Sequence, residues 1–366
     1  AKITNNLSNR NLIINGAMQV AQRGTSSTSG GFQTVDRFQN VRGGLDEAVT
    51  QAQHALTSSD TGPWEKGFRY SYHLTNGNQT SGAGASDYSI IRYNIEAQDM
   101  ASCGWDYTSA SSYITLSFWV KSSVAQNFYG NLLTGDGTMQ NYPYETGSLS
   151  ANTWTKITKK IPGNANLQFD NDNGAGFQID LWAFGGTTYT ASPTLNTWAA
   201  YASGTRMPAN SNTWWNTDDA TFEITGVQLE VGDFASDFCH EPYSETLRKC
   251  QRYCQVFGTD SGRIANIIAV VHGNGSSVYL HANFQPMRTT PSFTTNGTIR
   301  GNMFTGSNTH STLSSFTSEF ADNSTSTVGF SGLMHANSSE TSLQPGRSGF
   351  IYGNSAAASI VVSAEL

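Results

Sequence analysis

Residues 113–121, YITLSFWVK, alternate apolar and polar side chains and decide the fold class of the chain. A period of two is the pattern of a β-strand with one buried face and one exposed face. One face would hold Ile114, Leu116, Phe118 and Val120, and the other Thr115, Ser117, Trp119 and Lys121.

Three further segments alternate in the same way: residues 68–74 (FRYSYHL), 177–184 (FQIDLWAF) and 220–231 (ATFEITGVQLEV). In the last segment the apolar positions change parity between Ile224 and Val227. One extra residue in a strand restores the pattern, so we expect a β-bulge near Gly226. Clusters of Gly, Ser, Asn and Asp separate these segments at the spacing expected of a β-sandwich.

The length of the chain requires more than one packed unit. It has 366 residues, and a single hydrophobic core stops growing at roughly 250–300 residues. Charged residues make up 13% of the chain, where a soluble domain averages about 25%. Low charge with 36 Gly favours an all-β protein with many turns over a helical bundle.

One segment, residues 240–257 (HEPYSETLRKCQRYCQVF), predicts a helix that Gly258 ends. Pro242 suits its first turn, and Glu245 precedes Lys249 by four positions. Its narrow apolar stripe would pack on a neighbouring sheet or, alternatively, form a seam around a symmetry axis. The expected divisions are an N-terminal arm at 1–31, a β-sandwich at 32–235, a linking helix at 236–257 and a smaller C-terminal β domain at 258–366. The arm would dock on another chain or add an edge strand to the sandwich.

The charge balance argues against nucleic acid as a partner. The chain has 20 Lys and Arg against 27 Asp and Glu, for a net charge of −7, and no dense basic cluster. Its longest apolar run, residues 264–271, is far shorter than the roughly 20 residues that span a bilayer, so we expect no membrane insertion. Ala1 and Lys2 are followed by Ile-Thr-Asn-Asn, which is not an apolar stretch, so we expect no signal peptide. The four cysteines are too few for a disulfide scaffold, and we expect them to be reduced.

The motifs of common catalytic sites are missing from the sequence. It contains no GxSxG, GxxxxGK[ST] or HExxH pattern, so we expect a protein that is not an enzyme. A glycosidase needs only two carboxylates across a cleft, which leaves that alternative open. The carboxylates to consider are Asp180, Asp218, Asp219 and Glu223, for which we favour roles at a rim or in turns.

Residues 170–174, DNDNG, place several carboxylate and amide oxygens close together. Such oxygens suit Ca²⁺, with Asp170 and Asp172 as the ligands. The same residues are also ordinary turn formers. A structural calcium ion at this turn is therefore one of two interpretations, and we expect no other cofactor.

The aromatic residues are the most informative candidates for a binding site. Trp119 and Trp182 both lie on the polar side of their strands, so we expect them to leave the main core together. The long segment 185–219 carries further rings among Thr, Ser and Asn. Flat rings with a polar edge stack on sugars and also fill subunit interfaces. We therefore interpret these residues as contacts to a glycan, or alternatively as rings that fill one end of the sandwich or an interface: Trp119, Trp182, Tyr189, Trp198, Tyr201, Trp214 and Trp215.

Several stretches together resemble a family of virion structural proteins of tailed bacteriophages, of the tail fibre or tail spike type. They are residues 9–25 (NRNLIINGAMQVAQRGT), 35–38 (VDRF), 222–238 (FEITGVQLEVGDFASDF), 243–253 (YSETLRKCQRY), 284–291 (FQPMRTTP) and the ending 364–366 (AEL). The most specific portion runs from Ile224 to Tyr253. Cys254 stands where the family usually has an aromatic residue.

The resemblance implies that the large domain is a jelly-roll sandwich like those of carbohydrate-binding modules. It also implies a homotrimer on the virion, next to other virion proteins, that attaches to polysaccharide on the bacterial surface. Assembly in the reducing bacterial cytoplasm agrees with reduced cysteines. The family supplies no catalytic residues to transfer. Two alternatives stay open: a purely structural virion component, such as a head fibre, cement protein or tail adaptor, and a polysaccharide depolymerase.

Overall fold

The computed structural model describes residues 10–258, 263–271, 277–282, 285–303, 310–318, 333–338, 346, 348–353 and 358–366. Residues 1–9 of the expected N-terminal arm and Phe284 of the expected C-terminal domain lie outside these ranges. The chain divides into two compact units. The first comprises Ala1–Leu247 with Leu366, and the second Arg248–Glu365.

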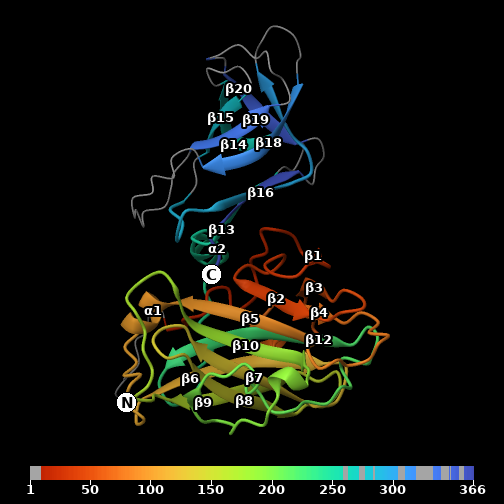
Figure 1. The fold of residues 1–366 in the computed structure, drawn as a ribbon, viewed down its shortest axis with the longest axis vertical. Helices are drawn as coiled ribbons and strands as arrows, with labels where there is room; N and C mark the ends of the chain where they lie inside the picture. Colours follow the sequence, from red (N-terminus) through yellow and green to blue (C-terminus); the bar gives the residue numbers. More distant parts are fainter. Residues whose placement is uncertain are drawn as a thin grey trace. The chain divides into compact units, whose positions relative to one another are not determined.

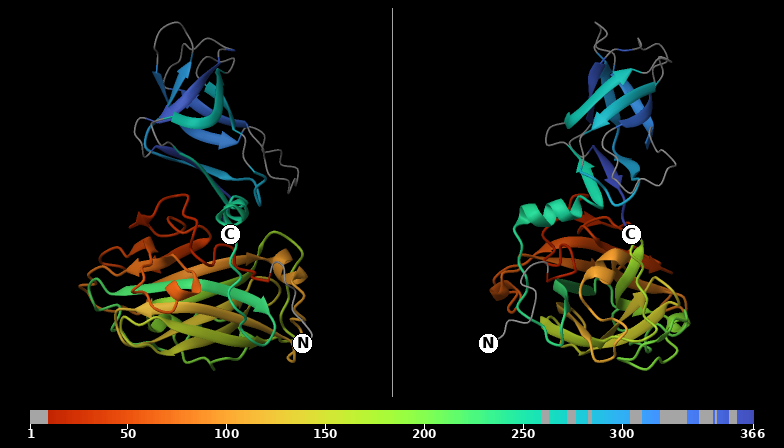
Figure 2. Two further views of the ribbon diagram at one scale, coloured as in Figure 1. Left: turned by 180° about the vertical axis from the view of Figure 1, so that it is seen from behind. Right: turned by 90° about the vertical axis from the view of Figure 1, so that its left-hand side faces the viewer.

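The first unit is a sandwich of two six-stranded antiparallel sheets. Figure 1 looks onto sheet B, and the left view of Figure 2 looks onto sheet A, where β12 is the long green strand. In spatial order, sheet A contains β1 (Ser26–Ser27), β3 (Thr50–Ala55), β4 (Tyr70–Thr75), β12 (Thr221–Val231), β6 (Tyr113–Ser122) and β9 (Thr155–Pro162). Sheet B contains β11 (Ala199–Ala200), β8 (Gln140–Ser148), β7 (Asn127–Thr134), β10 (Ala175–Gly185), β5 (Tyr88–Glu96) and β2 (Phe38–Gly43).

Strands that are distant in sequence pair within each sheet, and the chain passes repeatedly between the sheets. This arrangement confirms the expected all-β jelly-roll sandwich. The helical elements of its described residues are short: η1 (Trp64–Lys66), α1 (Ala97–Ser102), η2 (Thr187–Tyr189) and the start of α2 (Tyr243–Cys250).

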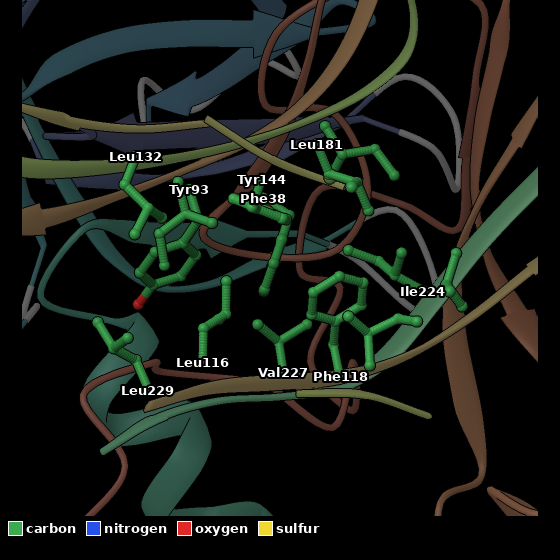
Figure 3. Close-up of a cluster of buried hydrophobic side chains, with 14 of the residues drawn as sticks. Phe38, Tyr93, Leu116, Phe118, Leu132, Tyr144, Leu181, Ile224, Val227 and Leu229 are labelled. Carbon is green, nitrogen blue, oxygen red and sulfur yellow. The ribbon is translucent and has the colours of Figure 1, made fainter. Parts of the chain in front are cut away.

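The alternating strands predicted from the sequence supply the main core. Ile114, Leu116, Phe118 and Val120 of β6 are all buried in it. Side chains of sheet B such as Leu132 and Leu181 point toward Leu116 and Val227 of sheet A (Figure 3). Each strand buries alternate residues in this core. The remaining residues of each sheet form the outer face of that sheet, so the sandwich has two outer faces.

Strand β12 contains the expected bulge. Its pairing with β6 shifts between Thr225 and Gln228, and Gly226 adopts φ 62°. A Cβ on Gly226 would lie 2.6 Å from the ring of Phe68. The bulge therefore lets Ile224 and Val227 both enter the core, and glycine is the residue that fits there.

The linking helix is shorter than the predicted one. Helix α2 ends at Cys250, and Cys254–Phe257 form strand β13 instead of a last helical turn. Strand β13 pairs with β21 (Ser359–Ser363), near the end of the sequence. Pairing with a distant strand outweighs the local helical pattern, because it buries Cys254 and satisfies the backbone at the same time. The four cysteines form no disulfide bond with one another.

The second unit is also built from strands. Strands β13, β21 and β16 (Ser292–Asn296) form a three-stranded sheet. A closed barrel contains β14 (Arg263–Val271), β15 (Ser277–Ala282), β19 (Leu333–Ser338), β18 (His310–Ser318), β17 (Ile299–Met303) and β20 (Ser348–Gly353). Among the described residues, no helix is long and apolar enough to cross a membrane.

The described part of the N-terminal arm packs on the sandwich of its own chain. The Leu12 amide donates to the Leu229 carbonyl at 2.9 Å. Ile13 and Met18 are buried in the main core, and β1 adds the edge strand of sheet A. Of the two interpretations of the arm, the edge strand is the one observed for these residues.

Candidate functional site

Three of the seven candidate aromatic residues belong to the main core and cannot contact a ligand directly. Trp214 and Trp215 are fully buried, and Trp198 is 8% exposed. The Trp215 ring packs on Phe184 with centroids 4.6 Å apart. These three rings pack in the main core, the position described by the alternative in which rings fill the sandwich. The sequence hid this outcome because the loop that carries them folds back into the interior.

Trp119 and Trp182 leave the main core as predicted, but not together. Trp119 lies on β6 of sheet A and Trp182 on β10 of sheet B. Each belongs to its own smaller apolar cluster. Alternation within a strand determines which side of its sheet a residue occupies, but it does not determine which sheet the strand joins.

A pocket of about 220 Å³ opens on the outer face of sheet B. We call it the sheet B pocket. It brings together two predicted candidates, Trp182 and Tyr189, with two arginines and another tyrosine. Its lining residues are Val41, Tyr88, Ile90, Arg92, Trp182, Tyr189 and Arg206.

Trp182 forms the floor of the sheet B pocket beneath the more accessible rings. It is fully buried, and its Nε1 donates to Asn131 Oδ1 at 2.6 Å. The ring centroids of Tyr189 and Trp182 are 5.6 Å apart. The ring of Tyr88 packs edge-on against that of Tyr189, with centroids 5.4 Å apart. Tyr88 and Tyr189 are half-buried, so they can offer ring surface while Trp182 holds them in place.

Arg92 supplies a charged wall that the strand register positions. It lies directly opposite Asp180 across β5 and β10. Its Nε and Nη2 donate to the two Asp180 oxygens at 2.8 and 2.9 Å. Burial opposes the charge on Arg92, but the hydrogen bond and charge of Asp180 outweigh it and raise the pKa of Arg92. The guanidinium of Arg92 is therefore held in a fixed orientation and is always charged.

Arg206 enters the sheet B pocket from the long loop after β10. Its guanidinium lies 5.8 Å from the Trp182 ring and 5.4 Å from the rings of both Tyr189 and Tyr201. Its Nη2 donates to the Tyr201 hydroxyl at 2.5 Å. Its Nε is buried without a hydrogen-bond partner in the described structure. Sequence reasoning missed Arg206, although an arginine within an aromatic loop is a signal that could have identified it.

Burial raises the pKa of the Tyr189 phenol, so Tyr189 presents a neutral hydroxyl at the pocket edge. Together the pocket offers half-exposed ring faces and guanidinium donors. It suits a neutral or anionic ligand that has flat apolar faces edged with oxygen atoms.

A second hollow, of about 320 Å³, lies on the outer face of sheet A beside Trp119. We call it the sheet A groove. The rings of Phe68, Phe238 and His240 pack together there, 4.8 to 5.1 Å apart. Lys66, Lys156 and Asp237 add charge at its wall. Trp119 is half-buried in this groove.

The four carboxylates considered for glycosidase chemistry do not come together. Asp180 pairs with Arg92 on sheet B, and Glu223 pairs with Lys121 on sheet A at 3.0 Å. Asp218 and Asp219 are exposed in the turn before β12, where Asp219 adopts φ 55°. The predicted turn role is correct for Asp218 and Asp219, whereas Asp180 and Glu223 are buried ion-pair residues.

Asp170 and Asp172 are exposed in the loop before β10. Asp172 Oδ1 accepts from the Gly174 amide at 2.8 Å, and Asp170 Oδ1 accepts from Gln168 Nε2 at 3.0 Å. These are the hydrogen bonds of an ordinary turn. Across the described residues, the His, Cys, Asp or Glu ligand atoms that converge in a group of three or more belong to His54, His73 and Glu223.

No protein-family model and no curated protein matches the chain. One similar solved structure is the enzymatically active domain of tailspike protein 4 from bacteriophage CBA120, with 11% identity and a TM-score of 0.30. That match covers 61% of this chain and 21% of the tailspike chain.

A putative sugar binding protein from Bacteroides thetaiotaomicron is similar at 12% identity and a TM-score of 0.31, over 61% of this chain and 100% of its own. The CBM22-1–GH10 modules of Clostridium thermocellum xylanase 10B, complexed with xylohexaose, are similar at 12% identity and a TM-score of 0.28. That match covers 59% of this chain and 30% of the xylanase chain. The architecture described above rests on the strand pairing of this chain itself.

Proposed function

We propose that this chain is a subunit of a bacteriophage virion appendage, of the tail fibre or tail spike type, that binds host surface polysaccharide through the sheet B pocket. The observation that carries the proposal is the convergence of Tyr88, Tyr189 and Arg206 above Trp182. Half-exposed rings can stack on pyranose faces, and the guanidinium groups can donate to ring and hydroxyl oxygens.

The sheet B pocket supports binding without chemistry. The buried carboxylate beside it, Asp180, is hydrogen-bonded through both oxygens to Nε and Nη2 of Arg92. A glycosidase needs a second carboxyl group across the bond to be cleaved, and Glu223 belongs to the other sheet. We therefore propose a binding protein and not an enzyme.

The homotrimer and the location on the virion are proposed from the resemblance of residues 222–253 to virion proteins of tailed phages. A trimer would also suit a weak pocket, because three linked copies raise avidity through effective concentration. Sedimentation equilibrium of the purified chain tests this point. Three chains per particle are expected, and a monomer at micromolar concentration would contradict the proposal.

The test of the binding site uses a panel of immobilised bacterial capsular and lipopolysaccharide glycans. The full-length chain should bind at least one of them, and Tyr189→Ala should weaken that binding about tenfold, the loss of one stacking contact of about 1.4 kcal/mol. Trp119→Ala is the matched control, because it removes a half-buried ring from the other face. Equal losses in both variants would contradict the assignment to sheet B.

A purely structural virion component is the second candidate function. The observation that favours it is that three of the seven candidate rings complete the core. Competition for phage adsorption separates the two functions. Purified protein that blocks adsorption in a dose-dependent way supports receptor binding, whereas unchanged adsorption without glycan binding supports the structural role.

A further inference from the structure

A second cluster of polar side chains lies on the outer face of sheet A, away from the sheet B pocket. It contains His54 on β3, His73 on β4 and Glu223 on β12, three neighbouring strands. His73 lies directly opposite Glu223 in the register of β12 and β4, and His54 lies opposite Ser71 on β4. The sheet itself therefore brings two imidazoles to one carboxylate.

The distances in this cluster are those between ligands of one metal ion. His54 Nδ1 lies 3.3 Å from Glu223 Oε2, and His73 Nδ1 lies 3.4 Å from Glu223 Oε1. All three ligand atoms lie within 4.8 Å of one another. With bonds of about 2.0–2.1 Å, tetrahedral zinc ligands are separated by roughly 3.3–3.4 Å. One cation could thus be bound by all three residues after small side-chain rotations.

Glu223 is held as an oriented, ionised carboxylate. Its side chain is 3% exposed, Ser71 Oγ donates to Oε2 at 2.7 Å, and Lys121 Nζ contacts Oε1 at 3.0 Å. Burial disfavours ionisation, but the hydrogen bond from His54, the neighbouring His73 and the Lys121 charge lower the pKa of Glu223 far below its usual range. Each oxygen has two lone pairs. Ser71 contacts Oε2 and Lys121 contacts Oε1, so the second lone pair of each oxygen is the one that faces a histidine nitrogen.

His73 is arranged as a metal-binding histidine would be. Its Nε2 is hydrogen-bonded to Thr75 Oγ1 at 3.0 Å, which orients the ring as outer-shell partners of metal-binding histidines do. Its Nδ1 is buried and makes no hydrogen bond, although it faces a carboxylate oxygen. With the proton on Nε2, the Nδ1 lone pair would face oxygen lone pairs, and a cation between them would remove that repulsion.

We propose that His54, His73 and Glu223 bind a first-row transition-metal dication, with Zn²⁺ as the preferred ion. Two imidazole nitrogens and a carboxylate are a ligand set that Zn²⁺ accepts, with a water molecule in the fourth position. His54 is 48% exposed, so it provides the route by which the ion and the water enter. The metal would join three strands of sheet A.

Lys121 sets the strength of this site. Its Nζ contacts Glu223 and also Asp60 Oδ1, at 3.0 Å. The positive charge of Lys121 offsets part of the negative charge of Glu223 that would attract the metal. A proton on His54 is the competing occupant, because an imidazolium beside Glu223 satisfies the same carboxylate. Zinc should therefore bind more weakly as the pH falls and protons occupy the imidazoles.

The experiment is calorimetric titration of the full-length chain with ZnCl₂ at pH 7.5, repeated with CoCl₂ to record the visible absorption of a tetrahedral site. We expect one ion per chain, and in His73→Ala and in His54→Ala a loss of affinity larger than the roughly 10- to 100-fold that removal of an outer-shell partner causes. His240→Ala is the matched control, because it removes an exposed imidazole from the sheet A groove and should leave the affinity unchanged.

Lys121→Met should change the affinity in the opposite direction. Removing the positive charge of the lysine beside Glu223 should tighten zinc binding severalfold. Thermal unfolding of each variant without metal checks the fold, and the exposed His54→Ala keeps the test valid if a buried substitution unfolds the chain. Absence of binding at 1 mM Zn²⁺ would overturn the proposal. So would binding that His54→Ala and His73→Ala leave unchanged, which would place the ion elsewhere.

Discussion

The two outer faces of the sandwich come from the same kind of antiparallel strand, but they carry different chemistry. On sheet B, rings and arginines surround a pocket that the loop after β10 completes. On sheet A, a buried glutamate gathers two histidines and a lysine, with a groove beside them. One face is suited to flat oxygen-edged ligands and the other to cations.

The difference shows that cross-strand neighbours determine the character of a face. Arg92 and Asp180 are 88 positions apart, and His54 and Glu223 are 169 apart. Arg92 meets Asp180 because β5 and β10 are adjacent in sheet B, and His54 meets Glu223 because β3 and β12 lie on either side of β4 in sheet A. The loop after β10 adds a second layer to sheet B, since it delivers Tyr189 and Arg206 over the face that Trp182 occupies.

The largest expected effect tests the distinction between core rings and face rings. Trp215→Ala removes a fully buried indole and should lower the free energy of unfolding of the sandwich by about 3–5 kcal/mol. Trp119→Ala removes a half-buried ring and should cost about 1–2 kcal/mol. Urea unfolding followed by tryptophan fluorescence measures both. Equal costs would mean that the two rings are packed equally well.

The next effect tests the bulge that shapes the sheet A groove. Gly226→Ala puts a side chain at φ 62° and against the ring of Phe68, so we expect a loss of about 2–3 kcal/mol. Gly104→Ala is the control, because Gly104 has φ 85° and open space around its Cα. It should cost only the conformational part, about 1–2 kcal/mol. Thermal unfolding measures the loss of stability in both variants. Equal losses would mean that contact with Phe68 adds nothing to the cost at Gly226.

A smaller effect addresses the sheet B pocket. Arg206→Ala removes the guanidinium near three rings and should weaken glycan binding about three- to tenfold, or about 0.7–1.4 kcal/mol. Lys156→Ala removes a charge from the sheet A groove and should leave binding unchanged. The affinity of both variants for the same immobilised glycan shows which of the two faces binds the ligand. If Lys156→Ala causes the larger loss, the ligand binds on sheet A.

The smallest expected effect is the pH dependence that Asp60, in the loop after β3, adds to stability. Burial opposes ionisation of Asp60, but hydrogen bonds from the Thr57 amide, Trp154 and Lys121 outweigh it and lower the pKa of Asp60 to about 2. A lowered pKa stabilises the fold above the unfolded value of 3.8, and this stabilisation disappears as the pH falls toward 2.

The melting temperature should therefore decline from pH 4 to pH 2, and less steeply in Asp60→Asn. Asp233→Asn is the control, since Asp233 forms an exposed ion pair with Lys160, a kind of pair that contributes little. If the two variants lose the same slope, Asp60 does not make the special contribution expected of it.

Some features follow from the sequence alone. The alternation at 113–121 and 177–184 predicts which residues enter the core, and the change of parity around Gly226 predicts the bulge. These are local properties, because side chains of a strand alternate whatever the strand pairs with. The all-β class and the departure of Trp119 and Trp182 from the main core follow for the same reason.

Only the tertiary structure decided which residues share a site. It put Trp119 and Trp182 on different sheets, buried Trp214 and Trp215, and ended α2 early so that β13 could pair with β21. It also joined Arg206 to Tyr189, and His54 to Glu223. These outcomes depend on strand order and loop packing between distant segments, which a local pattern does not contain.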